Sequence, residues 1–261
     1  MIYFIGAGPG AKDLITVKGK ELLEKADLII YAGSLVNPAL LDYAKKDCVI
    51  MNSAGMTLEE VIAAMVPAAQ EGKLVVRLHT GDPSVFGAHR EQMDLLRGYG
   101  LEFEVVPGVS SFMAAAAALK SEYTLPNVSQ SVIITRMEGR TPVPDRQKIV
   151  DYAKHNATMV IFLSAGMLEK LSKELIAGGF KSDTPAAIVY KASWPDEKVM
   201  RCTVGTLAAT GKANNVRNLA LICVGDFLGS EYDRSLLYDP TFAHGFRTAS
   251  KRPEKVKKEE K

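Results

Sequence analysis

The sequence predicts an α/β fold divided into two α/β domains. Short runs rich in Val, Ile and Leu alternate with stretches that carry apolar residues at helical spacing, first over residues 1–119 and again over residues 120–238. This alternation is typical of strands joined by helical crossovers, which form a mainly parallel sheet buried on both faces. At 261 residues the chain is long enough to give each domain its own core.

Residues 1–119 are expected to form the first domain. Its strands are predicted at residues 2–5, 28–31, 49–51, 74–78 and 103–106, and its helices at residues 17–25, 37–44, 58–69, 87–97 and 111–119. Thr57 and Glu60 have the spacing of a capping box, so one helix is expected to begin directly after Thr57.

Residues 120–238 are expected to form the second domain, after a connection near residues 121–127 that breaks the pattern. Its strands are predicted at residues 131–136, 159–164, 186–190, 198–204 and 219–224, and its helices near residues 146–155, 167–177 and 207–212. Only a short helix separates the last two strands, which favours antiparallel pairing in a mixed sheet. Residues 239–261 form a charged tail that is expected to be disordered.

Charge, cysteine content and hydropathy exclude several classes of protein. The formal net charge is only +2 at pH 7, and part of it comes from the tail, so nucleic acid is not expected as a partner. Cys48, Cys202 and Cys223 are far apart, so neither a disulfide framework nor a metal site is expected, and the protein is expected to be cytoplasmic. The apolar N-terminal run of about five residues is too short for a signal peptide or a membrane span.

The first of three glycine-containing turns is Gly-Ala-Gly-Pro-Gly at residues 6–10. A Rossmann fingerprint needs its third glycine three positions after the second, an immediate helix and an acid at the end of the second strand. Here the third glycine comes two positions after the second, the helix start is delayed to Thr16, and the second strand ends Tyr-Ala-Gly. No Gly-Lys-Ser/Thr follows, so a nucleotide phosphate site is disfavoured, while a tight turn that needs glycine stays open.

Two further turns end later strands, at residues 80–86 (TGDPSVF) and 106–111 (VPGVSS). Asp82 is expected to cap a helix that begins at Pro83, and Ser110 or Ser111 is expected to cap the alanine-rich helix. A functional interpretation stays open beside this one, because open parallel sheets bind ligands beyond the carboxyl ends of their strands. There Gly81 would let the backbone approach a ligand, and Asp82 and free N–H groups would contact its polar atoms.

The order GAGPG, TGDPSVF and VPGVSSF resembles the tetrapyrrole methylase family over about residues 2–227. These are S-adenosylmethionine-dependent enzymes that methylate uroporphyrinogen and corrin precursors. The flanking segments 31–36 (YAGSLV), 51–57 (MNSAGMT) and 77–80 (RLHT) are similar to the branch that methylates carbon 11 of precorrin-4 or of its cobalt form in vitamin B12 synthesis. The resemblance implies a methyltransferase whose S-adenosylmethionine lies in a cleft between the two domains, and not in a Rossmann loop.

The resemblance also implies which residues contact the cofactor. Seven come from the three turns and three from strand ends of the second domain, and together they are Pro9, Gly81, Asp82, Val85, Phe86, Ser110, Ser111, Leu163, Ala192 and Ala220. The last three match only by the positions of strand ends. Asp82 would lie beside a ligand that carries a sulfonium and an amino acid group.

A large macrocycle rimmed with acetate and propionate groups is the substrate that the resemblance implies, together with a homodimer. Arginine forks suit carboxylates, so Arg90 and Arg136 are the leading candidates for substrate binding, and His79 beside the second turn is a third. Methyl transfer from a sulfonium is an in-line displacement that cancels charge and needs no nucleophilic side chain, so no catalytic residue is assigned.

Other functions stay open at this stage. The acceptor could be another tetrapyrrole carbon, as in uroporphyrinogen III, or a protein histidine or ribosomal RNA, although the low net charge argues against RNA. A non-catalytic module that binds a small anionic ligand is the third hypothesis. The sequence does not decide whether the substrate carries cobalt, because a metal inside a macrocycle needs no ligand cluster of the protein's own.

Overall fold

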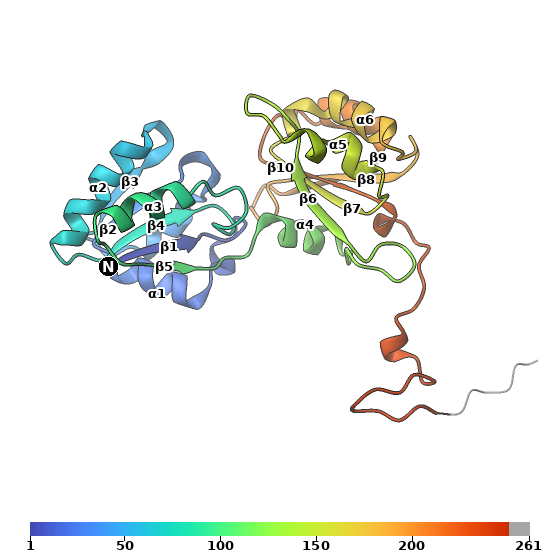
Figure 1. Cartoon of the computed structure of the whole chain (residues 1–261), viewed down its shortest axis with the longest axis horizontal. Helices are drawn as coiled ribbons and strands as arrows, with labels where there is room; N and C mark the ends of the chain where they lie inside the picture. Colours follow the sequence, from blue (N-terminus) through green and yellow to red (C-terminus); the bar gives the residue numbers. More distant parts are fainter. Residues whose placement is uncertain (251–261) are drawn as a thin grey trace, which may run out of the picture.

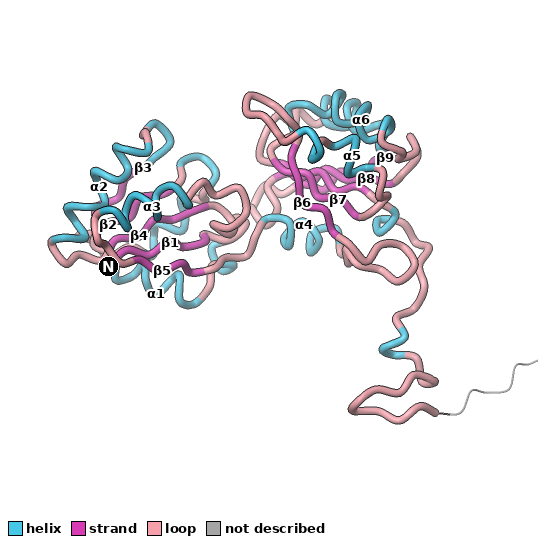
Figure 2. Tube along the Cα trace, in the orientation of Figure 1, coloured by secondary structure: helices cyan, strands magenta, loops and turns pink. Residues whose placement is uncertain are grey.

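The computed structural model describes residues 1–250 and consists of two α/β domains whose facing ends are loops (Figures 1 and 2). The first sheet has the strand order β3-β2-β4-β1-β5, and all of its strand pairs are parallel. Its strands are β1 (Ile2–Gly6), β2 (Leu28–Tyr31), β3 (Val49–Asn52), β4 (Val75–His79) and β5 (Phe103–Val106). The predicted parallel sheet is therefore confirmed.

Three α-helices belong to the first domain: α1 (Val17–Lys25), α2 (Leu58–Gln70) and α3 (Arg90–Gly98). The predicted capping box before α2 is confirmed. The Thr57 hydroxyl accepts a hydrogen bond from the Glu60 N–H, and the Glu60 carboxylate accepts one from the Thr57 N–H. The sequence pattern therefore located the start of α2 correctly.

Two helix predictions in this domain were wrong in part. The segment predicted at residues 37–44 forms a 3₁₀ helix, Pro38–Tyr43, in which N–H groups bond three residues back. Helix α3 begins at Arg90 and not at residue 87, because Phe86 and Ala88 have φ angles of 54° and 46°, which a right-handed helix excludes. Pro83 likewise lies in a turn and does not start a helix.

The second sheet is mixed, as predicted, with the order β6-β7-β10-β8-β9. Its strands are β6 (Val132–Arg136), β7 (Thr158–Phe162), β8 (Pro185–Tyr190), β9 (Lys198–Thr203) and β10 (Ala220–Val224). Strands β6 and β7 are parallel, whereas β10 pairs antiparallel with both β7 and β8, and β8 pairs antiparallel with β9. Strand β10 lies between β7 and β8, and it therefore begins at the end of the sheet at which β7 and β8 finish.

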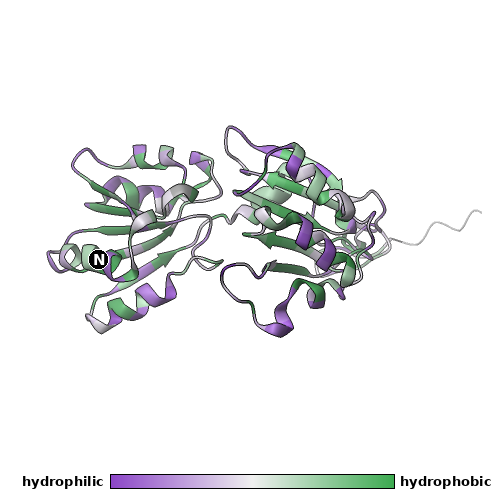
Figure 3. Ribbon diagram, turned by 90° about the horizontal axis from the view of Figure 1, so that it is seen from above, coloured by the Kyte–Doolittle hydropathy of each residue, from purple (hydrophilic) through white to green (hydrophobic). Residues whose placement is uncertain are grey.

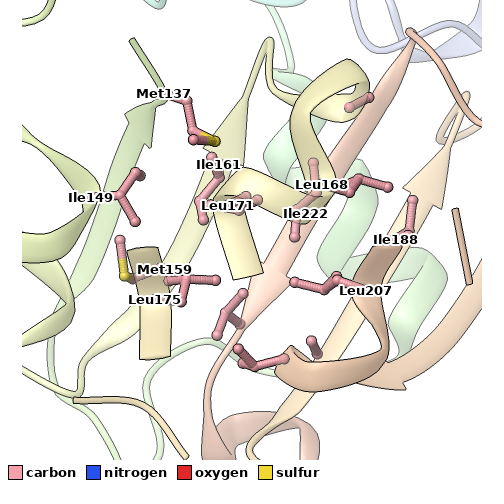
Figure 4. Close-up of a cluster of buried hydrophobic side chains, with 14 of the residues drawn as sticks. Met137, Ile149, Met159, Ile161, Leu168, Leu171, Leu175, Ile188, Leu207 and Ile222 are labelled. Carbon is pink, nitrogen blue, oxygen red and sulfur yellow. The ribbon is translucent and has the colours of Figure 1, made fainter. Parts of the chain in front are cut away.

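Alternate residues of the second sheet enter two separate cores, because side chains alternate between the two faces of a strand. On one face, Ile161, Ile188 and Ile222 pack against α5 (Ile149–Ala153), α6 (Leu168–Ala177) and α7 (Leu207–Ala213) (Figure 4). Figure 3 shows this burial by hydropathy: the strands of the sheet are largely hydrophobic, and the helices that cover them carry hydrophilic segments. The middle of the sheet is thus covered on this face.

Helix α4 (Ser111–Leu119) covers the other face of the second sheet. Its buried Ala114 and Ala115 pack in one cluster with Val160, Val189 and Leu221 of that sheet. The expectation that residues 111–119 belong to the first domain was wrong, because alanine side chains let this helix lie close to the second sheet. The chain crosses between the domains directly after β5.

Directly after β10, Phe227 is still buried against the second sheet, and the segment that follows, which includes the 3₁₀ helix Leu236–Tyr238, extends away from the second domain (Figure 1). Within it, His244 and Arg247 form an isolated bridge, and the Arg247 guanidinium donates hydrogen bonds to backbone carbonyls of Leu237, Asp239 and Phe242. The rest of the predicted tail, residues 251–261, lies outside the described residues. Within residues 1–250, no helix combines the length and the apolar character that crossing a membrane requires.

Candidate active-site cleft

A cavity of about 360 Å³ lies between the two domains. The first domain contributes the loops that follow β1, β2, β4 and β5, and the second contributes the ends of β7 and β8 and the start of β10. The structure brings together in its lining all ten residues that the sequence predicted as cofactor contacts: Pro9, Gly81, Asp82, Val85, Phe86, Ser110, Ser111, Leu163, Ala192 and Ala220. Their role in binding stays a prediction.

The three glycine-containing loops meet at a junction of bare backbone. A Cβ built on Gly6 would lie 2.5 Å from the Gly108 Cα and 2.6 Å from the Gly81 carbonyl oxygen. A Cβ on Gly108 would lie 2.2 Å from that same oxygen. Real Cβ atoms do not approach backbone atoms so closely. Glycine is therefore required at residues 6 and 108, because the three loops are in direct backbone contact there.

Asp82 ties the second loop to the third. One of its oxygens accepts hydrogen bonds from the Ser84 N–H and hydroxyl, and the other accepts one from the Gly108 N–H at 2.8 Å. Partial burial alone would raise the pKa of the Asp82 carboxyl, but the hydrogen bonds from Ser84 and Gly108 hold that pKa below its usual value. The predicted helix cap was wrong, since Asp82 instead closes a turn and anchors the neighbouring loop.

Left-handed backbone conformations gather at the rim of the cavity. Four non-glycine residues of its lining, Phe86, Leu163, Lys191 and Leu219, have φ angles between 47° and 54°. Such conformations cost about 1–3 kcal/mol each and persist only where the surrounding structure imposes them. Phe86 and Leu163 also expose 47% and 62% of their surface, so the rim offers apolar contact area to a ligand.

Side chains from both domains meet at the cleft. The rings of Phe86 and Phe162, one from each domain, have centroids 5.4 Å apart. In a second contact between the domains, the indole N–H of Trp194 donates to the Pro9 carbonyl at 3.0 Å, and the Ala11 N–H donates to the Ser193 hydroxyl at 3.0 Å. The Trp194 ring occupies the space that a side chain at Gly10 would need.

Trp194→Phe is expected to loosen this contact between the domains. The phenyl ring keeps most of the packing over Gly10, but the Pro9 carbonyl loses its indole donor, so the free energy of unfolding should fall by about 1 kcal/mol. Urea unfolding measures this change. It is followed by circular dichroism, because Trp194 is the single tryptophan of the chain and the variant has no tryptophan fluorescence. Unfolding at the wild-type urea concentration would contradict the assigned role of the indole N–H.

His79, predicted as a substrate contact, lines the cavity but is only 3% exposed. Its Nε2 atom is buried without a hydrogen-bond partner, and so is the Thr80 hydroxyl oxygen beside it. Burial lowers the pKa of His79 to about 3, and the nearby charges of Arg77 and His89 act in the same direction. A neutral imidazole with an unpaired nitrogen therefore lies against the cavity.

The two arginines predicted as substrate contacts lie outside the lining of this cavity. Arg90 is exposed at the start of α3 and pairs with Asp94 one helical turn on. Arg136 ends β6, and its guanidinium donates to the backbone carbonyls of Met137, Thr141 and Pro142. Their partners lie within their own segments, and a role in substrate binding stays a prediction for both.

The lining also contains residues to which the sequence assigned no role in the site, among them Leu35, Thr80 and Arg217, together with Lys191, whose charge and place at a predicted strand end made it a candidate for contacting substrate carboxylates. Thr80 precedes a predicted contact and carries an unpaired oxygen, so its place in the motif was the available signal. Lys191 follows directly after β8, at a strand end. Nothing in the local sequence around Arg217 distinguishes it from a surface arginine.

The family model of the Tetrapyrrole (Corrin/Porphyrin) Methylases matches residues 1–208, which include all three glycine-containing loops and most of the cleft. The chain belongs to this family. Tetrapyrrole methylases of solved structure share its fold. A cobalt-precorrin-4 methyltransferase has a TM-score of 0.86 at 49% identity, covering 88% of this chain and 96% of that one. The fold is therefore that of the tetrapyrrole methylases and not that of a Rossmann methyltransferase.

Other tetrapyrrole methylases are similar over nearly the whole chain. A cobalt-precorrin-4 C(11)-methyltransferase of Methanocaldococcus jannaschii is 54% identical over 96% of this chain and 97% of its own length. A precorrin-4 C(11)-methyltransferase of Pseudomonas aeruginosa is 43% identical over 94% of this chain and 98% of its own length. A uroporphyrin-III C-methyltransferase of Thermus thermophilus, complexed with S-adenosylhomocysteine, has a TM-score of 0.72 at 27% identity and covers 87% of this chain and 93% of that one.

Proposed function

We propose that this tetrapyrrole methylase transfers a methyl group from S-adenosylmethionine to carbon 11 of cobalt-precorrin-4 or precorrin-4, in the synthesis of vitamin B12. The observation that carries the proposal is the near full-length similarity to C(11)-methyltransferases. The interdomain cavity supports it, because the expected cofactor contacts of both domains line one space. Identity is higher to the cobalt-precorrin-4 enzyme, at 54%, than to the precorrin-4 enzyme, at 43%, which favours the cobalt form.

The cleft fits a cofactor with flat, apolar and polar parts. Its volume of about 360 Å³ lies within the range of ligand pockets, roughly 300–1,000 Å³. Exposed Phe86 and Leu163 offer apolar surface, and the unpaired Thr80 oxygen and the loop at Ser110 and Ser111 offer polar contacts. Asp82 would act by holding two loops together, since both of its oxygens already accept hydrogen bonds.

When bound, S-adenosylmethionine supplies an electrophilic methyl group on a sulfonium. The residues of this chain bind and orient the reactants and exclude water, which supports an in-line displacement. The Phe86–Phe162 pair and the Trp194–Pro9 hydrogen bond join the two domains at the cleft. The buried His79 imidazole stays neutral and keeps an unpaired nitrogen at the cavity, so this site adds no positive charge there.

A methylation assay tests the proposal directly. Purified protein is incubated without oxygen with methyl-labelled S-adenosylmethionine and either precorrin-4, its cobalt form or uroporphyrinogen III, and the products are mapped by mass spectrometry and NMR. We expect one added methyl at carbon 11, with faster turnover of the cobalt form and none of uroporphyrinogen III. A methyl on uroporphyrinogen III alone would assign the protein to another branch of the family. Calorimetry with S-adenosylhomocysteine tests cofactor binding independently of the acceptor.

The proposal includes a homodimer, as the family resemblance implies. Sedimentation equilibrium of the purified chain is expected to give twice the monomer mass of 28.3 kDa. A concentration-independent monomer that is active in the methylation assay would remove the dimer from the proposal and leave the chemistry unchanged.

A further inference from the structure

The lining of the interdomain cavity contains two basic side chains, Lys191 and Arg217. Lys191 is already engaged, because its ammonium lies 2.7 Å from the Asp196 carboxylate and over the rings of Tyr190 and Trp194. The pairing with Asp196 also raises the pKa of Lys191, so the ion pair is stable at neutral pH. Lys191 therefore brings its own counter-ion to the cleft.

The Arg217 guanidinium is exposed and has no hydrogen bond or ion pair with any of residues 1–250. Other arginines close to the cleft are occupied. Arg136 is bound to three backbone carbonyls, and the buried Arg77 donates to the Gln92 side chain and to the Ile30 carbonyl. Within the described lining, Arg217 is thus the one cation without a partner.

The backbone on both sides of Arg217 is fixed, although its side chain is free. Val216 is buried, and its N–H donates to the Gly211 carbonyl at 2.9 Å. On the other side, the Leu219 carbonyl accepts from the Lys191 N–H at 2.8 Å, and Leu219 itself has a φ of 53°. The free guanidinium is therefore presented at the cavity by an anchored backbone, an arrangement that suits a binding residue.

We propose that Arg217 binds an acid side chain of the macrocycle and is a specificity-determining residue for the acceptor. This inference rests on the proposed function, since it needs a substrate rimmed with carboxylates. A cavity of about 360 Å³ is at the small end of ligand pockets, so with the cofactor inside, a larger acceptor must extend over the rim. Arg217 lies at that rim, and a guanidinium pairs with a carboxylate through two parallel hydrogen bonds.

Three variants of Arg217 test the proposal: Arg217→Lys, Arg217→Gln and Arg217→Glu. Loss of a charged hydrogen-bonded contact corresponds to a rise in KM for the macrocycle of about tenfold to a hundredfold in Arg217→Gln. Arg217→Lys should lie between Arg217→Gln and the wild type, and Arg217→Glu should be the weakest binder. The matched control is Arg146→Gln, an exposed arginine of the same domain outside the cavity lining, which should keep the wild-type KM.

Cofactor affinity distinguishes binding of the macrocycle by Arg217 from binding of the cofactor by Arg217. The Kd for S-adenosylhomocysteine, measured by calorimetry without acceptor, is expected to stay within about twofold of wild type in Arg217→Gln. A tenfold weaker Kd would mean that the guanidinium binds the amino acid carboxylate of the cofactor, and an unchanged KM would mean that it binds neither; both results overturn the proposal. If wild-type protein methylates only uroporphyrinogen III, the proposed carbon-11 function fails, and the KM comparison is made with that macrocycle. If it methylates none of the three macrocycles, the proposed function and the role of Arg217 in substrate binding fail together.

Discussion

Gly108→Ala is expected to destabilise the protein by about 3 kcal/mol and to lower kcat/KM by about a hundredfold. The added methyl would lie 2.2 Å from the Gly81 carbonyl oxygen and 2.7 Å from the Gly6 Cα, and both are backbone atoms that no rotamer change can move. The loops must separate, and Asp82, whose carboxylate accepts from the Gly108 N–H, moves with them. Because Gly81, Ser110 and Ser111 line the cavity, cofactor contacts from two loops shift together.

Gly98→Ala is the matched control for this substitution. Gly98 ends helix α3, no atom lies within 4 Å of a Cβ built there, and its φ is not positive. The same added methyl should leave activity unchanged and stabilise the protein by about 0.5–1 kcal/mol through helix propensity. Urea unfolding and cofactor calorimetry on both variants make the comparison. Equal behaviour of Gly108→Ala and Gly98→Ala would contradict the close contact of the loops.

Acidification from pH 7 to pH 5 is expected to cost the folded protein about 2 kcal/mol through His79 alone. The folded-state pKa is lowered to about 3 by burial, whereas an unfolded histidine titrates near 6.5. Between these two pKa values the unfolded chain is protonated at His79, whereas the folded chain is not. The contribution of neutral His79 to the free energy of unfolding is therefore complete above pH 6.5 and is lost progressively as the pH falls toward 3. Most carboxylates titrate below pH 5, so they contribute little to the change between pH 7 and pH 5.

Two measurements isolate the His79 contribution. The difference in unfolding free energy between pH 7 and pH 5 should shrink by about 2 kcal/mol in His79→Gln and stay at the wild-type value in His155→Gln, where the side chain is exposed. NMR of the wild-type protein avoids any folding defect of a variant, and the His79 ring signals are expected to stay constant between pH 7 and pH 5. A titration of those signals centred near pH 6.5 would contradict the burial of a neutral imidazole.

The turns at the cleft could be predicted because the sequence encodes backbone constraints locally, whereas the individual cofactor contacts came from the resemblance of these turns to the tetrapyrrole methylases. Gly6 ends β1, and Gly81 and Gly108 follow β4 and β5, which are the parallel neighbours of β1, so the three loops lie at the same end of the sheet. The strands followed from short runs of apolar residues. The mixed second sheet was predicted correctly, but its last two strands, β9 and β10, do not pair with each other, because each lies antiparallel beside β8. These features depend on short-range pattern and on topology.

Side-chain partners and domain packing could not be predicted in the same way. Arg90 pairs with Asp94 on its own helix, a spacing that the sequence does contain, but Arg136 is bound by carbonyls of a loop whose path only the fold determines. The alanine-rich α4 has no polar face to orient it, so its sequence does not indicate which sheet it covers. Arg217 is distinguished by its place in the cavity lining and by the absence of a partner among residues 1–250, which are properties of the folded molecule.

The residues with left-handed backbone conformations at the cleft limit how far the thermal stability of this protein can be raised. Replacing Leu163 or Leu219 by glycine would relieve backbone strain, and a selection for thermal tolerance alone would favour such changes. The same changes would remove apolar surface from the cavity and free the loop that presents Arg217. The strain at the rim therefore marks positions where evolution toward higher temperature and evolution toward turnover oppose each other.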